Sequence, residues 1–230
     1  MKIALISDIH SNLEALLAVV KSAKEAGAQS FFCLGDIVGY GANPNECIEL
    51  LSSLDISGTV LGNHDIASLN KDFSRFGTEH GAHAIKWTAD NLKPASRAFL
   101  EKYMNAPNFY PGLDFAAFHG GPQNPYWQYI FPDRPAAEIA GNFSQVDYKT
   151  IFVGHSHLQF RFISGEKNIY NPGSVGQPRN GDPRAHYMIF DSESKRCMFL
   201  TAEYDISAAA EKIKKAGLSL FLAQRLFLGI

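Results

Sequence analysis

Five short apolar segments of this 230-residue chain each stop at residues that can bind a metal ion, and this feature constrains the fold more than any other. Each segment has the pattern of a buried strand, and in four of the five glycine accompanies the polar residues that follow it. Ligands bind beyond the carboxyl ends of strands in open α/β sheets, so these groups are predicted to meet there. The junctions are Asp8-Ile9-His10, Gly35-Asp36, Gly62-Asn63-His64-Asp65, His119-Gly120-Gly121 and Gly154-His155-Ser156-His157.

The first part of the chain alternates between strand and helix patterns. A helix is expected to follow a capping box made by Ser11 and Glu14 and to stop at Gly27, and Pro44 suits the first turn of a second helix. This order predicts a parallel, doubly wound start to an α/β fold. Strands are expected at residues 2–7, 30–34 and 58–61.

Beyond residue 66 the pattern changes. Helices are expected at 79–92 and 94–104, with no strand between them, so residues 66–113 are interpreted as a helical insertion. Two further helical stretches, separated by Gly217, are expected at about 206–228. We expect one domain over residues 1–230. The later strands are expected at 115–118, 150–153, 168–170, 186–190 and 198–204.

Composition excludes several classes of protein. The chain has 46% hydrophobic and 19% charged residues, as ordinary globular domains do. Its net charge of −2 offers no basic excess for general nucleic-acid binding, and no apolar run reaches the roughly 18 residues of a membrane span. No signal-peptide pattern is found near residue 1, and Cys33, Cys47 and Cys197 are scattered, so a cytoplasmic location is expected.

Each junction taken alone has a simpler explanation, because Asp, Asn and Gly also favour turns. Five of the eight histidines nevertheless lie in the five junctions, which turn formation does not explain. The other three, His80, His83 and His186, lack this context and are expected to be structural.

The junctions, in this order, resemble the sequence blocks of the calcineurin-like metallophosphoesterase superfamily: D-x-H, G-D-x-x-x-x-G, G-N-H-[DE], a His-bearing block and G-H-x-H. The resemblance covers residues 3–157 and extends through residues 171–179, which are similar to the phosphodiesterase branch. Tyr204-Asp205-Ile206 and Arg225-Leu226 resemble a bacterial dinucleoside-tetraphosphatase-like subgroup. The resemblance implies a two-sheet αββα sandwich with metals at one edge.

Two divalent metal ions are also implied, with Asp36 shared between them. Imidazole combined with carboxylate suits Mn, Fe, Ni, Co or Zn, whereas an all-oxygen Mg or Ca site would not recruit four imidazoles. A shared carboxylate allows the two cations to lie about 3.5–4 Å apart. The implied ligands are Asp8, His10, Asp36 and His157 for one ion, and Asp36, Asn63, His119 and His155 for the other.

The reaction implied is hydrolysis of a phosphate ester by a metal-bridging hydroxide, with His64 donating a proton to the leaving oxygen. The alternative for His64 is a structural place in a turn. Arg179 is the expected phosphate ligand, with Arg184 as the alternative, unless both are solvated. The expected substrate is a small phosphate ester or a nucleotide, including dinucleoside polyphosphates, and no oligomeric state is predicted.

Two departures separate the chain from protein Ser/Thr phosphatases. Gly39 and Tyr40 replace the acidic residue and the phosphate-binding Arg of that branch, and Asp65 replaces its Glu. Both changes argue against a protein phosphatase. They leave Asp65 as only a candidate for orienting His64.

An aromatic stretch follows His119 and suggests what the substrate contains. Tyr126, Trp127, Tyr129 and Phe131 lie within six residues of a segment that also contains prolines. Aromatic side chains stack on nucleobases, so Trp127 is predicted to shape a nucleotide-sized pocket. The alternative is that these aromatics pack the helical insertion onto the sheet, an interpretation favoured slightly for Phe131.

Two non-catalytic functions on the same fold remain open. One is a scaffold, and the other is a sensor that binds metal or nucleotide with negligible turnover. Scaffolds of this type tend to lose a metal ligand or the acid histidine, whereas all seven candidate ligands and His64 are present here. This favours catalysis.

Overall fold

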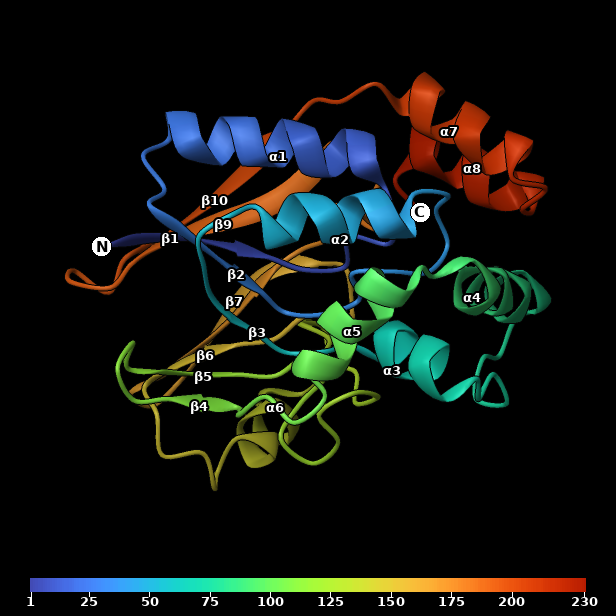
Figure 1. The fold of residues 1–230 in the computed structure, drawn as a ribbon. Coiled ribbons are helices and arrows are strands. Elements are labelled where there is room, and N and C mark those ends of the chain that lie inside the picture. The colour runs from blue at the N-terminus through green and yellow to red at the C-terminus, as the bar shows by residue number, and fades with distance from the viewer.

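Two five-stranded sheets pack face to face in the computed structural model, which describes residues 1–230, and eight helices surround them (Figure 1). The predicted αββα sandwich is confirmed. The strand order is β10-β9-β1-β2-β3 in the first sheet and β4-β5-β6-β8-β7 in the second. The first sheet contains β1 (Lys2–Ile6), β2 (Ser30–Cys33), β3 (Ile56–Thr59), β9 (Ala185–Asp191) and β10 (Cys197–Ala202). The second contains β4 (Phe109–Tyr110), β5 (Phe115–Ala117), β6 (Thr150–Phe152), β7 (Gln159–Ser164) and β8 (Lys167–Pro172).

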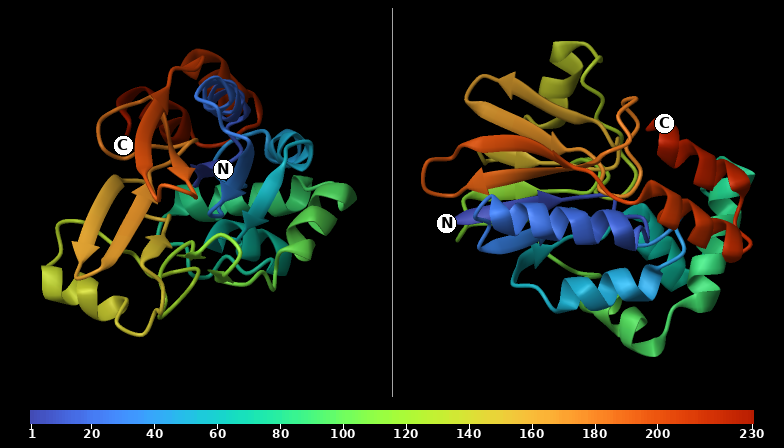
Figure 2. Two further views of the ribbon diagram at one scale, coloured as in Figure 1. Left: turned by 90° about the vertical axis from the view of Figure 1, so that its left-hand side faces the viewer. Right: turned by 90° about the horizontal axis from the view of Figure 1, so that it is seen from above.

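The helices divide into those that cover the sheets and those that gather at one end. In Figures 1 and 2, α1 and α2 cover the outer face of the first sheet, and α6 lies on the second. The others lie beyond the carboxyl end of β1, on the right of Figure 1. None of the eight has the length and apolar character needed to span a bilayer. The helices are α1 (Leu13–Glu25), α2 (Pro44–Ser52), α3 (Asn63–Asn70), α4 (Glu79–Asn91), α5 (Pro94–Lys102), α6 (Ala136–Asn142), α7 (Ile206–Lys215) and α8 (Leu220–Leu228).

Alternation along β1 sorts its side chains between two hydrophobic layers. Ile3 and Leu5 join the cluster between the sheets, whereas Ala4 and Ile6 pack with the buried faces of α1 and α2. Successive side chains of a strand point to opposite faces, and both faces of this strand are covered. Burial on both faces explains why the sequences of the predicted strands are continuously apolar and do not alternate with polar residues.

Parallel pairing brings the polar junctions to one end. In the first sheet, β1 pairs with β2 and β2 with β3, all parallel. In the second sheet, β5 pairs with β6 and β6 with β8, also parallel. The carboxyl ends within each group of strands therefore meet at one edge, as the sequence predicts.

The start of α1 differs from the prediction. Asn12, not Ser11, caps this helix, because its side-chain oxygen accepts the backbone N–H of Ala15 at 3.1 Å. Ser11 has φ +55°, and Glu14 binds Lys212 instead of closing a capping box. The chain turns sharply here to form the site, so the cap moves one residue along.

Several elements were not predicted. β4 lies within residues 66–113, where no strand was expected, and it is only two residues long. α6, of seven residues, and β7, of six, were also missed, although Phe160 and Phe162 alternate with polar residues at the start of β7. α3 begins at Asn63 in a block whose residues favour turns, and β3 ends at Thr59 instead of residue 61. The Asp65 carboxylate stabilises the start of α3 by accepting the Gly62 N–H at 3.0 Å.

Replacing Phe152 by alanine tests the packing between the sheets. Its fully buried ring lies 5.0 Å from the ring of Phe115 and 5.3 Å from that of Phe190, measured between centroids. Phe152→Ala is expected to lower the free energy of unfolding by about 3–5 kcal/mol, because it leaves a cavity. Chemical denaturation measures this loss. Ile163→Ala, at a side chain 57% exposed on β7, is the control, and an equal loss there would contradict this layer as the core.

Candidate metal centre

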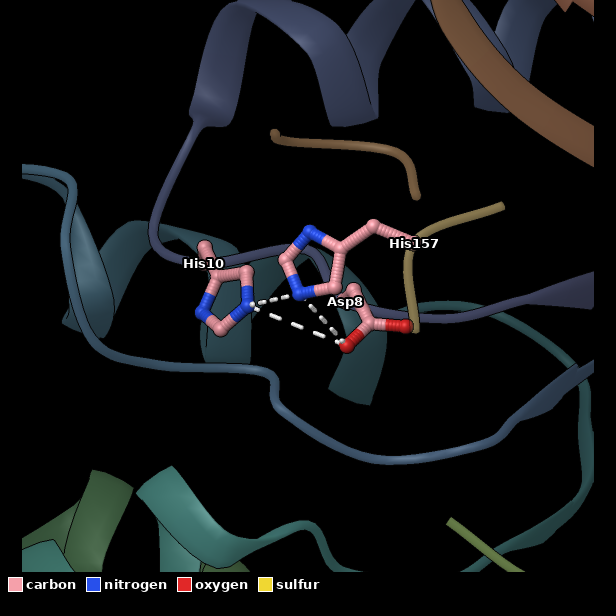
Figure 3. Close-up of side chains that lie close together, drawn as sticks. All are labelled: Asp8, His10 and His157. Atoms are coloured by element: carbon pink, nitrogen blue, oxygen red, sulfur yellow. Dashed lines mark hydrogen bonds and ion pairs between the residues drawn. The ribbon is translucent and has the colours of Figure 1, made fainter. Parts of the chain in front are cut away.

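The seven predicted metal ligands lie together at the carboxyl ends of the strands, and each is at most 3% exposed. Asp8, His10 and His157 form one group, drawn in Figure 3. The Nε2 atoms of His10 and His157 are 3.2 Å apart, and Asp8 Oδ1 lies 3.2 Å from His157 Nε2 and 3.8 Å from His10 Nε2. Three ligand atoms of different residues thus face one point.

A second group lies on the other side of Asp36. It combines Asp36 with His119 and His155, and Asn63 Oδ1 lies 3.2 Å from His119 Nε2. Asp36 Oδ2 is 3.3 Å from His119 Nε2 and 3.7 Å from His10 Nε2. Asp36 therefore lies between the two groups, as the ligand sets implied by the resemblance require.

Backbone carbonyls orient three of the imidazoles. The Nδ1 atom of His119 lies 2.8 Å from the carbonyl oxygen of Leu34, and His10 and His157 make the same contact with Val38 and Gln177. A carbonyl only accepts hydrogen bonds, so it fixes the proton on Nδ1 and leaves the Nε2 lone pair facing the site. This is the usual way in which proteins orient metal-ligating histidines.

Buried polar atoms without partners give an independent test of whether a cation fits. Asp8 Oδ1 and His155 Nε2 are buried and have no hydrogen-bond partner. Such atoms are rare in folded proteins, because losing water without a replacement is costly. A divalent cation would satisfy both atoms, and the mixed imidazole and carboxylate donors suit a transition metal.

The charges of the cluster favour a cation. Burial would raise the pKa of Asp8, but His157 and other imidazoles outweigh it and hold this pKa below its usual range. Burial, together with the charge of His119, lowers the pKa of His155 to about 3. Burial would also lower the pKa of His119, but Asp36 raises it to about 9. A proton on His119 thus occupies part of the negative site, and a bound metal would displace it.

Five of the ligand residues have backbone conformations that favour glycine. A left-handed backbone costs non-glycine residues of order 1–3 kcal/mol each, and such strain concentrates at functional sites. Hydrogen bonds between loops hold this geometry, with the Asp8 N–H donating to Gly35 O and the His10 N–H to Asp36 O, both at 3.0 Å. The five are Asp8 (φ +53°), His10 (+49°), Asp36 (+52°), His155 (+63°) and His157 (+60°).

Glycines let the backbone approach these ligands. A Cβ at Gly62 would lie 2.0 Å from Asp36 Oδ1, so no side chain fits there. A Cβ at Gly39, where φ is +94°, would lie 2.3 Å from His64 Nδ1. Gly39 is thus required by the His64 ring in this chain.

His64, the predicted acid, lies beside the ligands. Its backbone N–H donates to Asp36 Oδ1 at 2.8 Å, and its ring lies 4.4 Å from Tyr40, 4.7 Å from Phe76 and 4.8 Å from His10 between centroids. Burial lowers its pKa to about 4. Asp65, the candidate for orienting it, instead accepts backbone N–H groups, so packing among these rings orients His64.

His64 opens onto a cleft of about 370 Å³ whose lining includes Asn63, His155 and His157. Arg179 and Trp127, the two predicted substrate-binding residues, line the same cleft. Arg184 lies outside it and pairs with Asp182 at 2.6 Å, so the alternative phosphate ligand is wrong.

The three histidines expected to be structural differ in position. His80 is exposed and lines the cleft, where its ring stacks on Phe221 at 5.2 Å between centroids. His186 is buried behind the site. His83 is exposed on α4 and lies outside the cleft.

Four further cleft residues were not predicted to act at the site. Tyr129 stacks on His155 with centroids 3.8 Å apart, and Tyr40 lies 4.6 Å from His10. The place of each tyrosine in the sequence could have indicated a role at the site, because Tyr129 belongs to the aromatic stretch and Tyr40 to the second sequence block. Arg75 comes from a segment with no recognisable motif, and Arg225 belongs to the closing pattern that resembles the dinucleoside-tetraphosphatase-like subgroup but that was assigned no role at the site.

Comparison with known proteins agrees with this geometry. The family model described as the calcineurin-like phosphoesterase superfamily domain matches residues 1–195. The chain belongs to this superfamily. The predicted family is therefore confirmed, and phosphoester hydrolysis is the chemistry of its phosphoesterases.

Similar superfamily proteins cover nearly the whole chain. The uncharacterized protein MJ0912 of Methanocaldococcus jannaschii is 43% identical over 99% of this chain and 98% of its own length. A metallophosphoesterase from Sphaerobacter thermophilus has a TM-score of 0.86 at 36% identity, covering 100% of this chain and 99% of its own. The hypothetical protein PH1004 from Pyrococcus horikoshii shares the fold with a TM-score of 0.85 at 23% identity, covering 100% of this chain and 98% of its own.

Metal binding should stabilise the fold through Asp36. Adding Mn²⁺ in excess to chelator-treated protein is expected to raise the melting temperature by about 5–10 °C, because a ligand at 100 times its Kd contributes about 2.7 kcal/mol. Asp36→Asn should lose most of this shift, since it removes charge shared by both ligand groups. Thermal unfolding with and without the ion measures it. Asp133→Asn, at an exposed residue far in sequence from the ligands, should keep the full shift. An undiminished shift in Asp36→Asn would contradict the assignment.

Proposed function

We propose that this protein is a dinuclear metal-dependent phosphoester hydrolase that acts on a substrate of nucleotide size. The observation that carries the proposal is the opening of both ligand groups and His64 onto one cleft. When bound, two divalent cations neutralise phosphate oxygens and acidify the attacking water. The proposed holders are Asp8, His10, Asp36 and His157 for one cation, and Asp36, Asn63, His119 and His155 for the other.

His64 is the proposed general acid. Its Nδ1 is buried against Gly39 without a partner, while the ring borders the cleft between Tyr40 and Phe76. Its pKa of about 4 applies to the protein without cations or substrate, where burial disfavours the charged ring. A phosphate dianion in the cleft would favour the protonated ring, which then donates to the leaving oxygen.

Arg179 is the proposed ligand of the phosphate oxygens. Its Nη2 donates to Gln177 Oε1 at 3.1 Å, and the carbonyl of Gln177 accepts from His157 Nδ1 at 2.5 Å. One residue thus holds both the guanidinium and a proposed metal ligand. A guanidinium fixed in this way binds phosphate with little loss of side-chain entropy.

Trp127 is the proposed wall of a pocket for a flat ring. Its ring lies 5.6 Å from that of Phe76, which in turn lies 4.7 Å from His64, between centroids. The Arg75 guanidinium lies 4.4 Å from the Trp127 centroid. Trp127 is half-buried, so one part of the ring packs and another part faces the cleft, where a nucleobase can stack.

The metal and the acid are tested with a chromogenic phosphate ester. Chelator treatment should abolish hydrolysis, and Mn²⁺ or a similar ion should restore it. His64→Ala should keep about two ions per chain by elemental analysis but lose a factor of about 10² to 10⁴ in rate, the usual contribution of a positioned acid.

His83→Ala, an exposed histidine outside the cleft, is the matched control and should retain full activity. Loss of metal in His64→Ala would assign this residue to the ligands instead, because His64 also lies within 4.8 Å of His10 and Asp36 ligand atoms. Metal binding without turnover of any phosphate ester would indicate a sensor or scaffold.

Trp127→Ala tests substrate size. The variant should raise KM for a nucleotide or a dinucleoside polyphosphate about tenfold, because one stacked base contributes roughly 1–3 kcal/mol. KM for a small chromogenic ester should hardly change. Phe109→Ala, which removes an aromatic ring 48% exposed on β4 and outside the cleft, should not separate the two substrates. Equal losses for both substrates, with a lowered melting temperature, would show that Trp127 serves only packing.

A further inference from the structure

We infer that Arg179 and Arg225 together form a subsite for a second phosphoryl group, so that the preferred substrates carry a phosphoryl group joined directly to the one that is cleaved. This inference rests on the proposed function, because it places the cleaved phosphate at the metal centre. It goes further by requiring a second phosphoryl group beside the one that is cleaved and by assigning a role to Arg225.

The two arginines come from segments that are bonded to each other. Arg179 precedes a turn in which the Gly181 N–H donates to the Gly229 carbonyl at 2.9 Å, and Gly229 ends the helix that carries Arg225. Gly229 has φ +63°, and a Cβ there would lie 2.7 Å from backbone atoms of Asp182. This close contact fixes the end of α8 against the Arg179 loop.

Arg225 is also held from its own side. Its Nε donates to the carbonyl of Ile230 at 2.5 Å, and its guanidinium lies 5.3 Å from the Phe221 ring centroid. These contacts orient the side chain in the cleft, which both Arg225 and Phe221 line. An arginine held in this way loses little further entropy when it binds an anion.

The charge of Arg179 is not neutralised within the protein. Arg179 forms no salt bridge, whereas Arg184 pairs with Asp182 at 2.6 Å. Asp36, a proposed metal ligand, is the only carboxylate that lines the cleft. Arg179 Nε is buried and has no hydrogen-bond partner.

The positive charge of Arg179 repels that of Arg225 and lowers the pKa of Arg225. Burial and the nearby charge of Arg179 lower the pKa of Arg225 to about 10. It stays protonated at neutral pH, so two positive charges line one cleft. A bound anion removes this repulsion and supplies the missing hydrogen-bond partners.

The places of Arg179 and Arg225 relative to the metal centre suit two phosphoryl groups that are joined directly to each other. Gln177 forms hydrogen bonds with both Arg179 and the proposed metal ligand His157, so a single residue separates the Arg179 guanidinium from the metal centre. Arg225 lines the same cleft from α8. A phosphate bound at the metals would lie on the side of Arg179, and a second phosphoryl group joined to it would then extend toward Arg225.

Binding of two hydrolysis-resistant probes tests the inference. Methylphosphonate offers one phosphonate group, whereas methylenediphosphonate offers two that are joined by carbon. Isothermal titration calorimetry with metal-loaded protein should show tighter binding of methylenediphosphonate. Arg225→Gln should weaken its binding about tenfold or more, the worth of a lost charge-assisted hydrogen bond, and change methylphosphonate binding less than about twofold.

Gln224→Ala, at the exposed neighbouring position of α8, is the control and should leave both affinities unchanged. Arg225→Lys keeps the charge, so it should lose less affinity for methylenediphosphonate than Arg225→Gln. This variant keeps the inference testable if Arg225→Gln unfolds the end of α8. Equal weakening of both probes, or none in either Arg225 variant, would overturn the inference. A wild-type protein that binds metal but does not prefer the diphosphonate would overturn it and leave the metal centre intact. A wild-type protein that binds no metal would contradict the proposed function as well.

Discussion

The buried carboxylate of Asp8 connects the two sheets at the end where the site forms. Its Oδ2 accepts the Ser7 hydroxyl at 2.6 Å and the His155 backbone N–H at 3.2 Å, so a loop after the first sheet holds a loop after the second. Its backbone carbonyl accepts from Ser174 Oγ at 2.8 Å and from the Gly176 N–H at 2.9 Å. The relative position of the two ligand groups therefore depends on this one residue.

The same residue presents its other oxygen to the proposed metal site without a hydrogen bond. One carboxylate thus serves structure through Oδ2 and metal chemistry through Oδ1. The left-handed backbone conformation of Asp8 is tolerated because hydrogen bonds from several loops hold the backbone there. A fold that separated these two tasks would need a second buried charge, with its own desolvation cost.

The sequence predicted the parts of the site that lie directly after buried strands. Asp8, Asp36 and His119 follow short apolar runs, and parallel pairing makes the ends of such runs meet. The local sequence was enough to predict these three positions, because the burial of a strand and the formation of a turn each depend on only a few neighbouring residues. The metal-ligand role of Asn63 was predicted, but its place at the start of a helix was not, since Asn and Asp there also suit a turn.

The walls of the cleft were less predictable. Trp127 was found from its aromatic neighbours, but Arg75 and Arg225 reach the cleft only through tertiary packing. Arg225 lies on a helix whose pattern shows an apolar face and nothing about what its polar side approaches. The cap of α1 was misplaced for a similar reason, because the long-range bonds of the Ser11 backbone set the turn.

The attachment of α8 places one part of the cleft wall on a different hydrophobic cluster from the metal ligands. The α7 and α8 residues pack in a small cluster of their own with α4, apart from the layers that bury the metal ligands. Local opening of that cluster would withdraw Phe221 and Arg225 from the cleft without moving a proposed metal ligand. Under the proposed function, substrate recognition can therefore change, over time or in evolution, while the reaction chemistry remains the same.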